Sequence, residues 1–209
     1  MVHISTFGVY RWHLGKPAID DHTPVIDGAR RQGGAYRATK QISEALAFEL
    51  SRKYGLATTA VRPAGIYGAR DENTMPWFRG MMRLPLLVLP KFWFPFVYAG
   101  DVAQAVVGAL RNDGSAGRAY ITAGVNTTIY DFACAWREAA GLRKLILPIP
   151  VGTGVYVDNS AAEREIGFRN TPLVEGLRQS FADEERYRLG AAGRRPQPEA
   201  SAQPPELHA

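Results

Sequence analysis

The chain has 209 residues, of which 46% are hydrophobic and 11% aromatic. This composition is typical of a soluble globular protein and excludes collagen-like, coiled-coil and fully disordered chains. A single cysteine, Cys134, excludes a disulfide scaffold and a Cys-rich zinc module, so we expect a structural thiol. The net charge of +5 comes from 20 Arg and 5 Lys against 20 acidic residues. The arginines are scattered along the chain rather than clustered, so we expect no nucleic-acid partner.

Neither a targeting signal nor a membrane segment is apparent. The first residues lack the basic and apolar regions of a signal peptide. The charge-free run from Leu145 to Val157 is too short to span a bilayer and is interrupted by prolines and glycines. We therefore expect a cytoplasmic protein that makes no membrane contact.

Short strands and helices alternate along the chain. In chain order we expect a strand at 2–5, an irregular segment at 11–35, a helix at 36–54, a strand at 58–62, a helix near 75–83, a proline-punctuated apolar segment to 98, a helix from 101, strands at 119–122 and 144–149 flanking a helix at 129–140, and helices at 160–166 and 173–187. Ile42, Ala45, Leu46 and Leu50 share one face of the first helix, and Asp101 is the expected cap of a later one. This alternation predicts an α/β fold with a largely parallel sheet.

The most informative pattern is Tyr36-Arg-Ala-Thr-Lys40. Residues four apart share a helix face, and an ammonium ion near a phenol stabilises the phenolate, which suits acid–base chemistry. Taken alone the pattern is weak, because chance gives roughly 0.2 occurrences in a chain of this composition. The alternative is a surface lysine packed beside a helix tyrosine.

Hydroxyl and turn residues follow the strands on either side of this helix. Ser5 and Thr6 end the first strand, and Arg62-Pro63-Ala64-Gly65-Ile66-Tyr67-Gly68 ends the second. Ligands of open parallel sheets bind at the carboxyl ends of the strands. We therefore expect both segments to lie near Tyr36 and Lys40.

These three elements, in this order, resemble the extended short-chain dehydrogenase/reductase superfamily, specifically its NAD-dependent epimerase/dehydratase group. Hallmarks of that group are a Ser/Thr after the fifth strand, a Tyr-x-x-x-Lys helix and an Arg-Pro-x-x-x-Tyr-Gly turn. Residues 96–103 resemble its Phe-Val-x-Val-x-Asp-Val-Ala segment, and residues 158–168 resemble its late helix. The resemblance covers residues 2 to about 188.

The resemblance implies an NAD- or NADP-dependent oxidoreductase, epimerase or dehydratase that acts on a hydroxyl or carbonyl group of a small molecule. Tyr36 would be the general acid/base, Lys40 would bind the nicotinamide ribose, and Thr6 would hydrogen-bond the reacting oxygen. A hydroxyl that merely caps a strand end is the alternative for Thr6. The cofactor-binding positions that the resemblance implies are Ser5, Tyr36, Lys40, Pro63, Ala64 and Ile66.

Two departures from the family pattern concern the substrate, which Thr6, Gly65 and Phe94 would contact. Gly65 stands where sugar-nucleotide epimerases usually have an Asn, and Phe94 stands where many have a phosphate-contacting Arg. Loss of that arginine weakens the case for a sugar nucleotide and favours an apolar or aromatic alcohol or ketone. The alternative is that Trp93 and Phe94 are core residues.

No glycine-rich dinucleotide turn precedes Tyr36. We therefore expect the chain to be the C-terminal part of a longer reading frame, inactive by itself because the half that binds NAD or NADP is missing. Residues 1–74 would be the C-terminal part of a Rossmann-type doubly wound parallel sheet. Residues 75–189 would form a small mixed substrate-binding region with a returning strand and helix, and residues 190–209 a disordered tail.

Further expectations concern an alternative function, metal binding and the oligomeric state. A non-catalytic ligand-binding or sensor protein is the alternative function, against which the joint presence of Thr6, Tyr36 and Lys40 argues. The run Asp20–His22 has no second group of ligands, so we expect no metal site. The full-length form is a possible homodimer.

Overall fold

The computed structural model describes residues 1–26 and 29–192. Its elements in chain order are β1 (Val2–Ile4), η1 (Phe7–Val9), β2 (Gly15–Ile19), α1 (Ala29–Tyr54), β3 (Thr59–Pro63), β4 (Gly65–Tyr67), α2 (Thr74–Met81), β5 (Leu87–Pro90), β6 (Trp93–Tyr98), α3 (Ala99–Arg111), η2 (Asp113–Ser115), β7 (Ala119–Thr122), β8 (Val125–Thr128), α4 (Ile129–Ala139), β9 (Ile146–Ile149), β10 (Val155–Val157), α5 (Ser160–Glu165) and α6 (Leu173–Ala192).

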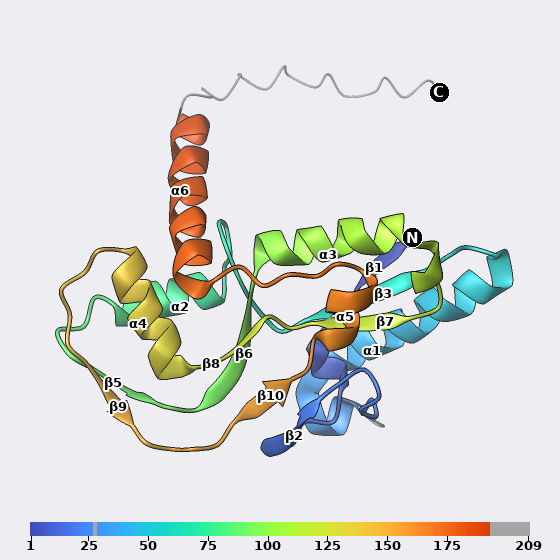
Figure 1. Cartoon of the computed structure of the whole chain (residues 1–209), viewed down its shortest axis with the longest axis horizontal. Coiled ribbons are helices and arrows are strands. Elements are labelled where there is room, and N and C mark those ends of the chain that lie inside the picture. Colours follow the sequence, from blue (N-terminus) through green and yellow to red (C-terminus); the bar gives the residue numbers. More distant parts are fainter. Residues whose placement is uncertain (27–28, 193–209) are drawn as a thin grey trace, which may run out of the picture.

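A three-stranded parallel sheet in the order β1-β3-β7 supports the sequence motifs of the first half of the chain. Ile4 of β1 pairs with Val61 of β3, which pairs in turn with Tyr120 of β7. Successive residues of a strand face opposite sides of the sheet. Val61 accordingly packs in a core cluster with α3, whereas its neighbour Arg62 pairs with Glu44 of α1. The two helices therefore lie on opposite sides of the sheet (Figure 1), which confirms the α/β fold with parallel strands.

Among the described residues, the other strands form three further sheets, which the sequence did not predict in full. β5 pairs with β9 and β10 pairs with β2 in parallel, whereas β8 runs antiparallel to β6 in the order β4-β6-β8. The segment 11–35, expected to be irregular, contains β2 and the start of α1, and the proline-punctuated segment contains β5 and β6. β2, β5 and β6 are short, and each contains a proline. Because proline is uncommon inside strands, the sequence pattern did not predict them.

The apolar face of α1 points toward solvent rather than toward the sheet. Gly34, with φ 73°, interrupts α1, so its regular part starts close to the expected Tyr36. Ile42, Leu46 and Leu50 do share a face, but that face is exposed, and the buried face carries Glu44 instead. The side of α1 that faces the sheet is thus partly polar.

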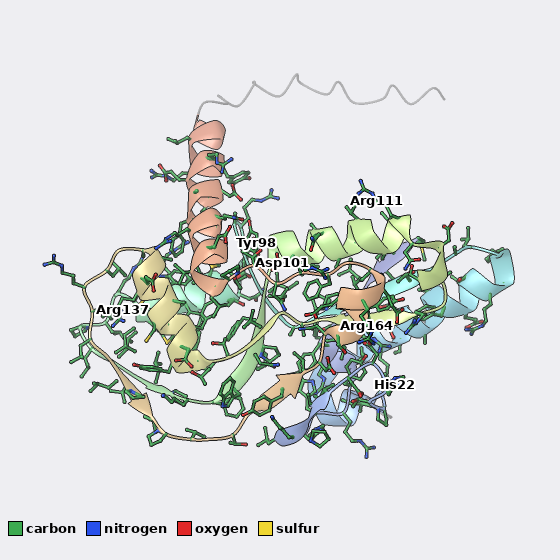
Figure 2. The ribbon with its side chains drawn as sticks, in the orientation of Figure 1. His22, Tyr98, Asp101, Arg111, Arg137 and Arg164 are labelled. Atoms are coloured by element: carbon green, nitrogen blue, oxygen red, sulfur yellow. The ribbon has the colours of Figure 1, made fainter. Side chains whose placement is uncertain are left out.

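Asp101 lies inside the first turn of α3 rather than at its cap, which is Tyr98. Figure 2 shows both residues where β6 passes into α3. The Asp101 carboxylate accepts hydrogen bonds from the Thr171 amide at 2.8 Å and the Thr171 hydroxyl at 2.6 Å. It therefore ties the start of α3 to the segment before α6.

An aromatic cluster forms the core beneath α2, α4 and α6. Phe132 of α4 is fully buried, and its ring centroid lies 4.3 Å from that of Phe96, 4.5 Å from Phe78 and 5.2 Å from Tyr67. The buried residues of α4 include Phe132, Ala133 and Trp136, so this face of the helix points into the cluster. Half-buried Cys134 also packs against this cluster.

The last helix extends further than expected. The predicted tail starts at 190, but α6 continues to Ala192; residues 193–209 lie outside the described part. Among the described helices, none is both long and apolar enough to cross a membrane.

We predict that Phe132→Ala lowers the free energy of unfolding by about 3–5 kcal/mol, because the cavity that it leaves is enclosed by other aromatic rings. Urea denaturation measures the loss. Tyr54→Ala at the exposed end of α1 is the control, with an expected change within about 0.5 kcal/mol. Similar losses in both variants would contradict the assignment of this core.

Candidate active site

Three segments that carry the expected site residues meet at one edge of the parallel sheet. β1 and β3 are adjacent and parallel, so their carboxyl ends lie side by side. Ser5 and Thr6 follow β1, and residues 63–66 end β3 and begin β4. α1 packs against the η1 turn that follows Thr6. The sequence-based expectation that these segments come together therefore agrees with the structure.

Thr6 begins the turn that follows β1. Its Oγ1 accepts a hydrogen bond from the Gly8 amide at 3.1 Å, so the hydroxyl does cap a local turn. A hydroxyl that accepts one bond still has its own proton to donate. Ser5, the preceding residue, is buried, and its amide donates to the Val61 carbonyl at 2.9 Å. Ser5 therefore holds the turn against β3.

Tyr36 and Lys40 lie on the first turns of α1 after Gly34. The Tyr36 side chain is 62% exposed, and the Lys40 ammonium donates to the Ile4 carbonyl at 3.0 Å. Among the described residues, no hydrogen bond joins Thr6, Tyr36 and Lys40 to one another. The structure thus brings the three residues onto adjoining segments without linking them directly.

A cavity of about 430 Å³ opens beside Tyr36. Ala64, Gly65 and Ile66 form one part of its wall, and the rest comes from residues 68–71, the start of α2 and Ala99. Its size lies in the range of small-molecule sites, about 300–1,000 Å³. Pro63 is buried at the end of β3 and does not line the cavity.

Phe94 stands behind the cavity wall rather than in it. A Cβ atom at Gly65 would lie 2.9 Å from Cε1 of Phe94 and 3.2 Å from the Pro95 carbonyl oxygen. The half-buried Phe94 ring also contacts Phe96 and Trp12, with centroids 5.3 and 6.2 Å away. The two departures from the family pattern are therefore one feature, because the Phe94 ring occupies the space that a side chain at 65 would need.

A neighbouring cavity of about 640 Å³ shares Arg70 with the first. Arg70 has φ 62°, and its guanidinium lies 5.1 Å from the ring centroid of Tyr187 in α6. This contact was not predicted, because no pattern in the residues around Arg70 indicates a neighbour in α6.

The residues Asp20–His22, where the sequence predicts no metal site, form a local turn. The Asp20 carboxylate accepts from the His22 amide at 3.1 Å and the Thr23 hydroxyl at 2.8 Å. Figure 2 shows His22 on the loop that follows β2. Among the described residues, no group of three or more His, Cys, Asp or Glu side chains is placed to hold a metal ion.

A buried ion pair between β3 and α1 was not predicted from the sequence. Arg62 Nε donates to Glu44 at 3.0 Å, and Nη2 makes a second bond to the same carboxylate. Burial raises the pKa of Glu44, but the hydrogen bonds and charge of Arg62 outweigh it, so that the net pKa is lowered. The available signal was the position of Glu44, one helical turn after Lys40 on the same face.

A model of the NAD dependent epimerase/dehydratase family matches residues 1–123. Among curated proteins, the chain is 29% identical over 131 residues to the highly reducing polyketide synthase calA of Penicillium decumbens, covering 57% of this chain and 4% of that protein. It is 32% identical over 127 residues to the mitochondrial NADH dehydrogenase (ubiquinone) 1 alpha subcomplex subunit 9 of Arabidopsis thaliana, covering 55% of this chain and 29% of that protein. The chain therefore spans less than a third of either relative.

Among solved structures, the fold is similar to UDP-glucuronic acid 4-epimerase from Bacillus cereus in complex with NAD. The TM-score is 0.70 at 19% sequence identity, and the match covers 89% of this chain and 61% of the other. At this identity the likeness supports the fold and leaves the substrate open.

We predict that Gly65→Ala lowers the free energy of unfolding by about 1–3 kcal/mol, because the added methyl group overlaps the Phe94 ring. Gly80→Ala in α2 is the matched control, since nothing lies within 4 Å of its Cβ position. That change is expected to be neutral or to stabilise the helix by up to about 1 kcal/mol. Equal effects of the two substitutions in urea denaturation would contradict the close packing of Phe94.

We also predict that Glu44→Gln destabilises the protein by about 3–5 kcal/mol at pH 7, because it leaves the buried Arg62 without a counter-charge. The pKa of Glu44 is lower in the folded than in the unfolded state, so its stabilisation is present above the unfolded value and is lost as pH falls through the folded value. The loss in free energy of unfolding caused by Glu44→Gln should therefore become smaller as the pH falls below about 4.5. Urea titrations at several pH values measure it.

Glu49→Gln, at an exposed position on the same helix, is the control and should change stability little at any pH. A Glu44→Gln deficit that stays constant with pH would show that the ion pair is not its source.

Proposed function

Because the chain belongs to the NAD-dependent epimerase/dehydratase family, we propose that it performs nicotinamide-dependent oxidation or reduction at a hydroxyl or carbonyl carbon of a small molecule. The observation that carries the proposal is the cavity of about 430 Å³ that Tyr36 lines together with the β3–β4 turn. Lys40 follows Tyr36 by one helical turn, and Thr6 begins the η1 turn against which α1 packs. When bound, the nicotinamide group supplies or accepts the hydride.

The residues present fit the nicotinamide end of such a cofactor. Ala64 and Ile66 offer backbone and small apolar surface on the cavity wall. The ammonium of Lys40 makes one hydrogen bond, to the Ile4 carbonyl, and an ammonium has three protons to donate. Lys40 therefore has protons left for a ribose hydroxyl.

Tyr36 would exchange a proton with the reacting oxygen of the substrate. Its exposed phenol lines a cavity that a small molecule can enter. The Thr6 hydroxyl accepts from Gly8, so its own proton is available to that oxygen. Together the two hydroxyls would hold the oxygen during hydride movement.

We propose that the substrate is an uncharged small molecule rather than a sugar nucleotide. Arg70 is the only cationic side chain that lines the described cavity, and its guanidinium lies over Tyr187. Both oxygens of Asp71 accept backbone amides at the start of α2. An uncharged alcohol or ketone suits these walls better than a diphosphate does, because a diphosphate needs unoccupied cationic partners.

We predict that Tyr36→Phe reduces NADH-dependent turnover by about 10²-fold or more, because a proton-transfer group is removed. The dissociation constant for NADH and the stability should stay unchanged. The assay follows NADH oxidation and NAD⁺ reduction with acetophenone, cyclohexanone, UDP-glucose and UDP-glucuronic acid, in the protein expressed from its complete reading frame. Tyr54→Phe is the matched control: it lies on the same helix, and the two tyrosines are 62% and 63% exposed.

Full turnover in Tyr36→Phe would overturn the assigned role. Wild-type protein that binds NADH but converts none of the probes would favour the non-catalytic ligand-binding alternative. Conversion of the UDP-sugars alone would overturn the proposed substrate class.

A further inference from the structure

One buried tyrosine contacts all three segments that carry the site. Tyr10 ends the turn that Thr6 begins, and its side chain is fully buried. Its backbone carbonyl accepts from Arg37 Nη2 at 2.7 Å, and its hydroxyl accepts from Arg62 Nη1 at 2.5 Å. Arg37 belongs to α1 and Arg62 to β3, so Tyr10 connects the η1 turn to both.

Each of these contacts lies next to a site residue. Arg37 adjoins Tyr36, and its Nε also bonds the Gly8 carbonyl in the same turn as Thr6. Arg62 immediately precedes Pro63, at the start of the turn that lines the cavity.

Glu44 completes the connection from the helix side. It lies one helical turn after Lys40 and holds Arg62 through two hydrogen bonds. The relative position of helix, turn and strand is thus set by hydrogen bonds among the buried Tyr10, Glu44 and Arg62 and from the half-buried Arg37.

Tyr10 does not serve as a proton donor or acceptor itself. Burial raises its pKa to about 12, so it remains a neutral phenol at physiological pH. Its ring lies against the Arg62 guanidinium, at 4.7 Å from the centroid, and its environment excludes the solvent that a catalytic proton would need. Its effect on chemistry can only be through the placement of other residues.

We propose that Tyr10 is a positioning residue, which fixes Tyr36 and Lys40 relative to Thr6 and the β3–β4 turn by joining Arg37 to the buried Arg62–Glu44 pair. This inference rests on the proposed function, because it gives those residues a reaction to be positioned for. A displacement of about 1 Å at a reacting group costs of order 10²-fold in rate, so such a connection matters even though it touches no substrate.

The chain contains a matched control. Tyr120 is also fully buried; its hydroxyl donates to Glu165 at 2.7 Å, and the guanidinium of Arg118 lies 5.2 Å from its ring centroid. Arg118 and Glu165 form an ion pair, as Arg62 and Glu44 do. The side chains of this second group join β7 to α5. Tyr120 pairs with Val61 of β3 through the backbone, but the side-chain hydrogen bonds of the group reach neither the η1 turn, nor α1, nor the β3–β4 turn. Tyr10→Phe and Tyr120→Phe therefore remove the same atom from two buried tyrosines that each contact an arginine–glutamate pair, although the Arg118–Glu165 pair is more exposed than the Arg62–Glu44 pair.

The test is ¹⁹F NMR of the full chain with its 9 tyrosines replaced by 3-fluorotyrosine. The Tyr36 signal is assigned by its loss in Tyr36→Phe. We expect Tyr10→Phe to move or broaden that signal by more than its linewidth, and Tyr120→Phe to leave it in place, with thermal unfolding recorded for both. Glu44→Asp, which keeps the charge but shortens the side chain, should move the Tyr36 signal as Tyr10→Phe does.

An unmoved Tyr36 signal in Tyr10→Phe or in Glu44→Asp, with only a lower unfolding temperature, would show a purely structural role and overturn the inference. Equal displacement in Tyr120→Phe would overturn it as well. If Tyr10→Phe does not fold, Glu44→Asp decides the question alone. The measurement uses neither cofactor nor substrate, so a moved signal in a protein without turnover counts against the proposed function and not against this inference.

Discussion

The Arg62–Glu44 pair is the contact on which the arrangement of the site depends. Two charges removed from water cost several kcal/mol each, which is recovered only if their geometry and hydrogen bonding are nearly complete. Here the guanidinium contacts both carboxylate oxygens and the Tyr10 hydroxyl. Because few other placements of α1 on the sheet would satisfy this pair, it determines where Tyr36 and Lys40 lie.

The same contact explains why the apolar stripe of α1 is exposed. A helix that turns a carboxylate toward the sheet must turn Ile42, Leu46 and Leu50 away from it, since they lie on another face. Helical periodicity identifies which residues share a face but not which direction the face points. The sequence therefore predicted the helix and its stripe but not the exposure of the stripe.

Elsewhere in the fold, elements with regular local periodicity were predicted, whereas contacts between distant residues were not. Regions with regular periodicity, such as α4 and β3, were predicted within a few residues, and the three motif segments came together because adjacent parallel strands end at one edge. β5 and β6 were missed because prolines interrupt short runs. The Tyr10–Arg62 contact spans 52 positions, and no local pattern records such a pairing. The packing of Phe94 on Gly65 was similarly hidden, although both residues were noticed as departures from a family pattern.

We propose that the cavity beside Tyr36 receives the nicotinamide end of the cofactor. A crystal structure of the protein from its complete reading frame with NADH tests this directly. We expect the nicotinamide ring to lie against Ala64 and Ile66, with a ribose hydroxyl within hydrogen-bond distance of Lys40 Nζ. A nicotinamide ring bound at another place, with the Tyr36 cavity empty at saturating NADH, would contradict it.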